Sequence, residues 1–166
     1  MIIILNGSIG VGKTSISWEL NRRLAPSVML DGDYIGAVNP FALYDKERTA
    51  YLYRTFAHLV QFHLENGYQH FIINYVFEQA EELHGLLDAL APLQQAVHCF
   101  WLSCTLEEQQ RRIRQRNNNQ MDWELERAVE LSNILNTAHQ TDFIGQKVEI
   151  TNKDQATVAT EIMAKI

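Results

Sequence analysis

Cysteine is scarce in this chain, because Cys99 and Cys104 are the only two among its 166 residues. They bound the apolar stretch CFWLSC, and an extended strand would place them too far apart to form a disulfide. Free thiols, buried or half-buried, are therefore expected, as in a reducing compartment. A chain of this length buries enough surface to fold without a disulfide or a structural metal.

Long apolar runs and excess positive charge are missing as well. No apolar run reaches the roughly 20 residues of a membrane span, and the N-terminus lacks the basic region and the cleavage site of a signal peptide. We therefore expect a cytoplasmic protein. The formal net charge of -6 argues against general binding to nucleic acid or to an anionic membrane, because both need a basic surface.

Short apolar runs alternate along the chain with stretches of helical spacing. The five runs are Ile2–Leu5, Val28–Leu30, Phe71–Ile73, Val97–Leu102 and Val148–Ile150. Apolar residues recur at helical steps over 15–24, 46–65, 81–90, 106–116, 123–138 and 155–166, which predicts helices. Apolar strands that alternate with helices are typical of a parallel sheet covered on both faces. The sequence therefore predicts a single α/β domain over residues 1–166, without internal repeats or linkers.

The stretch GSIGVGKTS, residues 7–15, follows the first apolar run and precedes the first helix. It satisfies G-x-x-x-x-G-K-[ST] in the strand-to-helix context that this pattern requires. Glycines let the backbone wrap around an anion with N–H groups pointing inward, and the helix adds the positive end of its dipole. Lys13 is expected to reach the β- and γ-phosphates of a nucleotide, and the Thr14 hydroxyl to bind Mg²⁺. The predicted phosphate-binding residues are Gly7, Ser8, Gly10, Val11, Gly12, Lys13, Thr14 and Ser15.

Switch GTPases, ATPases and small-molecule kinases all use such a loop, so other parts of the sequence must separate them. DYIG at 33–36 comes too early for a GTPase motif, and NKDQ at 152–155 has glutamine where a carboxylate would read guanine. ATPases that activate water usually end a strand in two acidic residues, whereas the run at 71–73 continues into Asn74 and Tyr75. Asn74 can bind a ligand but is a poor proton acceptor at pH 7. These features favour a kinase.

Two aspartates, Asp31 and Asp33, follow the second apolar run. Alternation on an extended strand sends both to one side, and the end of this strand should face the same crevice as the phosphate-binding loop. Asp31 is then expected to help hold Mg²⁺, and Asp33 to orient and deprotonate an acceptor hydroxyl. A helix cap followed by a turn is the alternative, because aspartate favours both.

Four arginines crowd the end of the helix expected over 106–116, at positions 111, 112, 114 and 116. Arg112 and Arg116 lie four residues apart and share a face, whereas Arg111 and Arg114 are better explained as solvated residues near a helix C-terminus. The polar break 117–120 and the following residues would form a lid over about 116–127, which brings Arg127 to the phosphates. We expect Arg112, Arg116 and Arg127 to neutralise charge on the transferring phosphoryl group.

The short first strand, GSIGVGKT, the D-x-D after the second strand and R-x-x-x-R before a lid resemble P-loop small-molecule kinases of the nucleoside-monophosphate-kinase-like group. Members include shikimate, gluconate and adenylylsulfate kinases and chloramphenicol phosphotransferase. The resemblance implies a three-layer P-loop NTPase fold, a five-stranded parallel sheet in the order 2-3-1-4-5, ATP as donor and Mg²⁺. It implies that Arg112 and Arg116 lie near the ATP phosphates and adenine, and that Asn152 lies in the loop at the adenine edge. The glycine-rich stretch that binds shikimate in that family is absent, which argues against shikimate as the acceptor.

The acceptor is expected to bind to the segment over about 34–66. Arg48 and Arg54 share a row of one predicted helix and could hold an anion, although the solvated face of an amphipathic helix explains them equally well. The predicted substrate-binding residues are Asp33, Tyr34, Arg48, Arg54 and Asn74, with Asn39, Phe41, Tyr44, Tyr51 and Tyr75 as further candidates. The sequence thus predicts an ATP- and Mg²⁺-dependent kinase of a small molecule. A nucleotide-binding regulatory or resistance ATPase and a nucleoside-monophosphate kinase remain alternatives, and neither the acceptor nor the oligomeric state is predicted.

Overall fold

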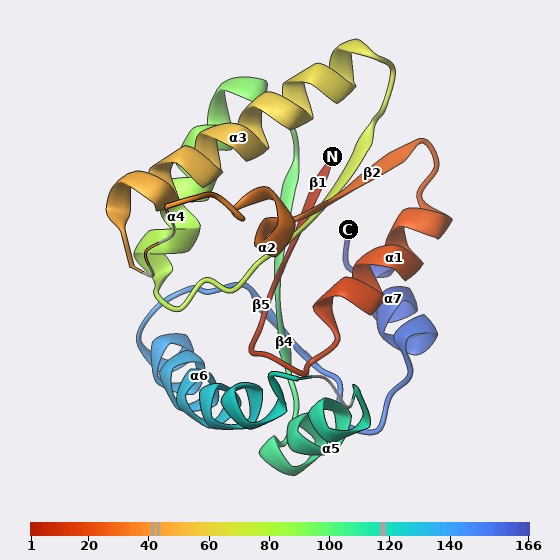
Figure 1. Ribbon diagram of the computed structural model, residues 1–166. Coiled ribbons are helices and arrows are strands. Elements are labelled where there is room, and N and C mark those ends of the chain that lie inside the picture. Colours follow the sequence, from red (N-terminus) through yellow and green to blue (C-terminus); the bar gives the residue numbers. More distant parts are fainter. Residues whose placement is uncertain (41, 43, 117–118) are drawn as a thin grey trace.

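A five-stranded sheet forms the centre of the computed structural model, which describes residues 1–40, 42, 44–116 and 119–166. Its strands are β1 (Ile2–Asn6), β2 (Ser27–Asp31), β3 (His70–Asn74), β4 (Val97–Ser103) and β5 (Gln146–Glu149). All neighbouring strands are parallel, in the order β2-β3-β1-β4-β5. The predicted parallel sheet and its strand order are confirmed (Figure 1).

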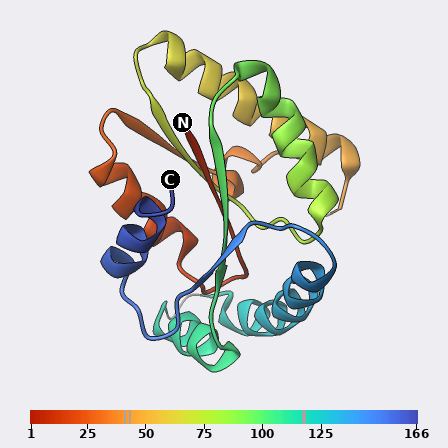
Figure 2. The ribbon, with the colours of Figure 1, turned by 180° about the vertical axis from the view of Figure 1, so that it is seen from behind.

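Helices cover both faces of the sheet, which gives three layers (Figures 1 and 2). One face packs against α1 (Lys13–Arg23) and α7 (Gln155–Met163), and the other against α3 (Lys46–Glu65) and α4 (Ala80–Leu90). The period of two along β1 explains this division, since Ile2 and Ile4 join the core beneath α3 and α4 while Ile3 and Leu5 join the core beneath α1 and α7. The predicted three-layer fold is therefore also confirmed.

Two further helices lie beyond the carboxyl ends of β1 and β4. They are α5 (Leu106–Arg116) and α6 (Met121–Thr141), which lie side by side in both views (Figures 1 and 2). A third core forms where Leu135 and Ala138 of α6 pack on Trp101 of β4. Two short helical elements, α2 (Gly32–Ile35) and η1 (Ala91–Leu93), complete the fold.

Two properties bear on expectations from the sequence. Cys99 and Cys104 are free thiols, as predicted. Among the described residues, no helix is both long enough and apolar enough to span a membrane.

Candidate active site

The stretch from Gly7 to Gly12 forms a tight loop between β1 and α1. Gly7, Gly10 and Gly12 have φ values of 151°, 82° and 93°, a region that residues with a side chain rarely adopt. A Cβ atom on Gly10 would also lie 2.9 Å from Cγ1 of Ile113 in α5. Gly12 is the N-cap of α1 and, within the described residues, no side chain caps this helix. The first N–H groups of α1 are therefore available to an anion.

The Lys13 ammonium lies across this loop. Its Nζ donates hydrogen bonds to the carbonyl oxygens of Gly7, at 2.9 Å, and Ser8, at 3.1 Å. Burial lowers the pKa of Lys13 to about 8, although Asp33 and Asp31 act in the opposite direction and stabilise the charged form. The ammonium is therefore already in place beside the N–H groups that would bind phosphate.

Thr14, Asp31 and Asp33 form a chain of contacts from α1 to α2. The Thr14 hydroxyl donates to Oδ2 of Asp31 at 3.1 Å, and Oδ1 of Asp31 accepts from the main-chain N–H of Asp33 at 3.0 Å. Asp31 is thus the N-cap of α2, as the capping alternative supposes, and it also contacts the phosphate-binding loop. Asp33 is exposed as a residue, but its carboxylate lines a cleft beside Lys13, where partial desolvation raises its pKa against the opposing effect of the Lys13 charge.

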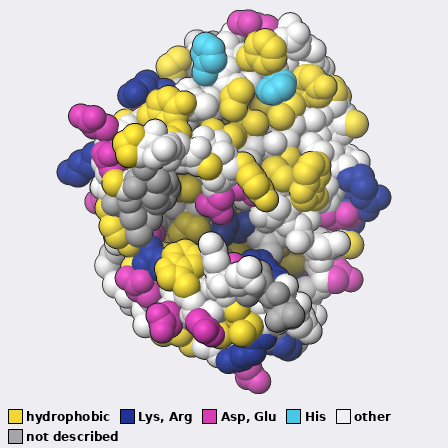
Figure 3. Space-filling model, in the orientation of Figure 1, with side chains coloured by type: hydrophobic (Ala, Val, Ile, Leu, Met, Phe, Trp, Pro, Cys, Tyr) yellow, Lys and Arg dark blue, Asp and Glu magenta, His cyan; other side chains and the backbone are white. Residues whose placement is uncertain are grey.

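Two clefts meet over the loop. A cleft of about 720 Å³ lies toward α5 and the segment 152–156, and one of about 460 Å³ lies toward α2, α3 and α6. Both are lined by Gly10, Gly12, Ser15 and Arg116, so they form a continuous groove across the loop. Acidic, basic and apolar side chains meet around the hollow in this face of the molecule (Figure 3). We call the larger the base-side cleft and the smaller the acceptor-side cleft.

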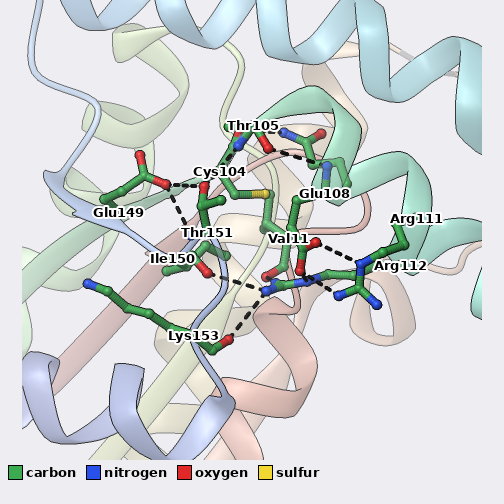
Figure 4. Close-up of polar contacts among 11 residues, drawn as sticks. Val11, Cys104, Thr105, Glu108, Arg111, Arg112, Glu149, Ile150, Thr151 and Lys153 are labelled. Atoms are coloured by element: carbon green, nitrogen blue, oxygen red, sulfur yellow. Dashed lines mark hydrogen bonds and ion pairs between the residues drawn. The ribbon is translucent and has the colours of Figure 1, made fainter.

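Arg112 ties together the walls of the base-side cleft (Figure 4). Its Nε donates to Glu108 at 2.7 Å and Nη1 to the Val11 carbonyl oxygen at 3.0 Å. Its Nη2 donates to the carbonyl oxygens of Ile150 and Lys153, each at 3.3 Å. Hydrogen bonds from Arg111, together with Arg112, lower the pKa of Glu108 to about 2, so this anchor stays ionised. Arg112 therefore fixes the phosphate-binding loop relative to α5 and the loop before α7.

Arg116 and Arg127 lie on either side of the polar break before α6. Arg116 lines both clefts and lies 3.9 Å from the Glu124 carboxylate. Arg127 forms ion pairs with Glu78 and Glu130, and it donates to the Tyr44 hydroxyl at 2.9 Å. These contacts join α6 to the β3–α4 connection and to the segment before α3.

Comparison with known proteins agrees with this geometry. Residues 2–132 match the model of a family described as AAA domain (AAA_33). The chain belongs to this family. No sequence among curated proteins matches it.

Solved structures share the fold of this AAA domain along nearly its whole length. The tunicamycin resistance protein of Deinococcus radiodurans has a TM-score of 0.73 at 19% identity, over 99% of this chain and 94% of that one. A sugar kinase from Janibacter sp. has a TM-score of 0.71 at 15% identity, over 98% and 92%. The APS kinase CysC of Mycobacterium tuberculosis, in complex with AMPPNP and APS, has a TM-score of 0.64 at 16% identity, over 98% and 95%. The resemblance to P-loop kinases of this group is thereby confirmed.

The structure of the AAA domain brings many of the predicted site residues together. The acceptor-side cleft is lined by Lys13, Thr14, Asp33, Arg48, Arg116 and Arg127, and the base-side cleft by Val11, Arg112 and Asn152. Tyr34 and Arg54 are exposed outside both clefts, and Asn74 is buried beneath them with its amide 3.6 Å from the Met29 sulfur. Phe41 and the lid residues 117–118 lie outside the described residues.

Other residues at the site are missing from the sequence prediction. Glu78 lines the acceptor-side cleft, and Asn6 lies buried beneath the loop. Trp123 lies within the lid predicted over about 116–127, but the sequence did not predict that it lines the acceptor-side cleft. Oδ1 of Asn6 accepts from the N–H groups of Gly7, at 2.7 Å, and Phe77, at 2.9 Å, while its Nδ2 donates to the carbonyls of Phe77 and Ile144. The sequence signal for Asn6 was its place as a polar residue between an apolar strand and a glycine.

Proposed function

We propose that this AAA domain is an ATP- and Mg²⁺-dependent phosphotransferase that phosphorylates a small molecule at a hydroxyl group. The carrying observation is that Lys13, Thr14 and Asp33 line one cleft at the phosphate-binding loop. This cleft continues over Gly10 and Gly12 into a second cleft large enough for a nucleotide base and sugar. One groove can thus hold a donor and an acceptor end to end.

The residues around Thr14 fit a magnesium ion. The Thr14 hydroxyl and the Asp31 carboxylate, 3.1 Å apart, supply oxygen donors of the kind that Mg²⁺ prefers. A magnesium ion held by these two side chains would supply positive charge that offsets the negative charge of the nucleotide phosphates. Thr14 and Asp31 are therefore the residues that we assign to the metal.

In the proposed reaction, Asp33 accepts the proton of the acceptor hydroxyl. The acceptor oxygen forms a bond to the γ-phosphorus as the bond between that phosphorus and the β–γ bridging oxygen breaks, and ADP leaves. The raised pKa of Asp33 makes it a better base than an ordinary carboxylate. Lys13 and Arg116 line the cleft where negative charge develops on the phosphoryl oxygens.

Arg112 and Arg127 act in this proposal through the shape of the groove. Arg112 holds the base-side walls, with Asn152 beside it in the left-handed conformation at φ 57°. Arg127 holds α6 against Glu78 and Tyr44 at the acceptor side. Both were predicted as charge-neutralising residues, and in this arrangement each guanidinium is already bound to oxygen atoms of the protein.

Several observations support a kinase working in the cytoplasm. Fold neighbours include a sugar kinase, a gluconokinase from Sinorhizobium meliloti and the APS kinase. The free thiols suit a reducing compartment, and the net charge of -6 does not favour nucleic acid as a partner. The tunicamycin resistance protein among the neighbours supports a second candidate. This is a nucleotide-binding resistance or regulatory ATPase that phosphorylates no metabolite.

ADP release from MgATP, measured with and without a panel of hydroxylated metabolites, separates the two functions. The kinase predicts release that depends on an acceptor, and Lys13→Ala should abolish it because the ammonium is lost from the γ-phosphate site. Slow release at one rate with every compound and with none would favour the second candidate.

A further inference from the structure

The charges around the acceptor-side cleft restrict what the acceptor can be. Beyond Lys13 and Arg116, which serve the phosphates, the cleft is lined by two cations, Arg48 and Arg127. A phosphorylated or carboxylated acceptor would need at least one of these guanidinium groups to bind its anion. The surroundings of each therefore decide whether the cleft suits an anion.

Arg127 is bound by carboxylates on both sides. Its side chain is only 10% exposed, forms ion pairs with Glu78 and Glu130, and donates to the Tyr44 hydroxyl. An anionic acceptor would have to displace a carboxylate from this guanidinium or lie beside one. Either arrangement is unfavourable, because like charges at short range repel.

Arg48 is part of the wall of the acceptor-side cleft. It is 8% exposed, and its Nε donates to the Ala42 carbonyl oxygen at 3.1 Å. Its Nη2 donates to the Tyr75 hydroxyl at 3.4 Å. These contacts hold the start of α3 against the residue that follows β3, and they direct two of its N–H groups to the protein.

Three carboxylates face the four cations that line this cleft. Asp33, Glu78 and Glu124 all line the acceptor-side cleft. Glu124 lies near Arg116, at 3.9 Å, so part of the charge that serves the phosphates is already matched by the protein. With Glu124 matched to Arg116, the carboxylates Asp33 and Glu78 balance the remaining two arginines. The acceptor end of the cleft therefore carries no excess of positive charge, and it favours an uncharged or a positively charged molecule.

Apolar surface completes the cleft. Trp123, at the start of α6, lines it with a side chain that is 55% exposed, and Tyr75, Val76 and Leu131 lie in the same wall. An exposed indole face can stack on a ring of a ligand. Trp123 is therefore a candidate platform for the acceptor, and Glu78, which lines the same cleft, can accept a hydrogen bond from a hydroxyl or ammonium group of that acceptor.

We infer that the acceptor is an uncharged or cationic hydroxyl compound with a ring or apolar face, and that Glu78 and Trp123 select it against anionic analogues. This inference rests on the proposed phosphotransferase function. It disfavours a nucleoside monophosphate as acceptor, a possibility that the sequence leaves open.

Matched pairs of acceptors that differ by one anionic group test the charge selection. ADP release from MgATP is measured with uridine and UMP, cytidine and CMP, and glucose and glucuronate, with glucosamine as a cationic member. The uncharged or cationic member of a used pair should have a kcat/KM at least about tenfold above that of its anionic partner, as expected for one unfavourable charge contact.

Variants assign this selection to the two residues. Glu78→Gln should lower the ratio of kcat/KM between the uncharged and the anionic member of a pair about tenfold, because Arg127 then faces the cleft without this carboxylate. Glu130→Gln is the matched control, since it also removes a partner of Arg127 but not a residue lining the cleft. Trp123→Ala should raise KM about two- to tenfold, as expected for a lost stacking contact. Trp18→Ala, at a tryptophan of 59% exposure outside this cleft, should leave KM unchanged.

The outcomes separate the inference from the function on which it rests. Equal or better use of an anionic member overturns the inference and leaves the phosphotransferase standing. ADP release at one rate with every compound and with none overturns both. A preference for the uncharged member that Glu78→Gln leaves unchanged overturns the assignment to Glu78, and a KM that Trp123→Ala leaves unchanged overturns the assignment to Trp123.

Discussion

The Thr14 hydroxyl and the Asp31 carboxylate are joined by a hydrogen bond of 3.1 Å, which links the first turn of α1 to the end of β2. Thr14 follows β1 and Asp31 ends β2, and these two parallel strands, with β3 between them, end at the same edge of the sheet. Their oxygens therefore meet at the position that we propose for Mg²⁺.

Asp31→Asn should uncouple nucleotide binding from magnesium. The amide keeps the shape but loses the negative charge, so Mg²⁺ should strengthen ATP binding much less than in the wild type. Titration of a fluorescent ATP analogue with and without MgCl₂ measures this coupling. Asp45→Asn, which changes a capping aspartate of α3 outside both clefts, is the control. An unchanged magnesium effect in Asp31→Asn would remove Asp31 from the metal site.

Asp33→Asn should stop transfer while leaving ATP binding intact. The amide cannot accept the proton of the acceptor hydroxyl, and removal of a general base costs about 10²- to 10⁴-fold in rate. The main-chain N–H of residue 33 still donates a hydrogen bond to Oδ1 of Asp31, so α2 should keep its position. Single-turnover rates and ATP affinity measured on the same variant check both parts, and a near-normal transfer rate would show that another group takes the proton.

Lys13 should take up a proton when ATP binds at alkaline pH. Its pKa is lowered to about 8 in the free protein, so above this value the side chain is mostly neutral, whereas phosphate favours the ammonium. Calorimetric titrations at pH 8.5 in two buffers of different ionisation enthalpy should show proton uptake, and at pH 6.5 they should show almost none. Lys13→Met should abolish the difference between the buffers.

The same shift affects stability in a defined direction. Between pH 8 and the ordinary lysine value of 10.5, the unfolded chain holds more protons at this position than the folded chain. In this window the contribution of Lys13 to the free energy of unfolding therefore increases as the pH rises. In the ATP titrations described above, proton uptake of equal size in Lys13→Met would show that another group takes up the proton.

The sheet and the phosphate-binding loop could be predicted because their signals are local. Ile2, Ile3 and Ile4 form a β-branched apolar run that is typical of a strand buried on both faces, and the glycines of 7–12 stand at positions where φ is positive. Alternation along an extended strand predicted that Asp31 and Asp33 point to one side, but β2 ends at Asp31, which caps α2, and Asp33 lies within that helix, as the capping alternative supposes. Each of these predictions depends on a few neighbouring residues and on one rule.

The acceptor side could not be predicted equally well, because it depends on how distant elements are placed. The role of Glu78 at the site depends on its ion pair with Arg127, which is 49 residues away in the sequence. This ion pair forms only when α6 packs over the β3–α4 connection. Arg48 and Arg54 lie on the same predicted helix, but the first is buried in the cleft wall and the second is exposed. Helical spacing alone did not reveal which face of α3 the sheet would bury.

Arg112→Ala should lower both stability and nucleotide affinity. The variant leaves the carbonyls of Val11, Ile150 and Lys153 without this donor and Glu108 without one of its two arginines. We expect a loss of about 2 kcal/mol in the free energy of unfolding. Arg114→Ala, an exposed arginine on the same helix, should stay within about 0.5 kcal/mol of the wild type. Denaturant titration and ATP binding on both variants make the comparison, and equal losses would refute a specific role for Arg112.

Asn6→Ala should loosen the phosphate-binding loop from below. The side chain is 1% exposed and pairs with four main-chain groups, from Gly7, Phe77 and Ile144. Each buried group left without a partner costs about 1–3 kcal/mol, with some relief from local relaxation or water. We therefore expect a loss of about 3 kcal/mol in the free energy of unfolding.

A general loss of stability would not distinguish Asn6 from other buried residues, so the decisive measurement is local. Gly7 begins the loop and Phe77 precedes α4, and Asn6 joins both through its one carbonyl oxygen. Hydrogen exchange should accelerate at Gly7 and Phe77 in Asn6→Ala more than in the sheet interior, because the two amides lose their acceptor while β3 keeps its pairing. Asn136→Ala, at an exposed position of α6, should change neither stability nor exchange. Uniform acceleration across β1, β3 and the loop would mean that Asn6 supports the fold as a whole rather than the position of the loop.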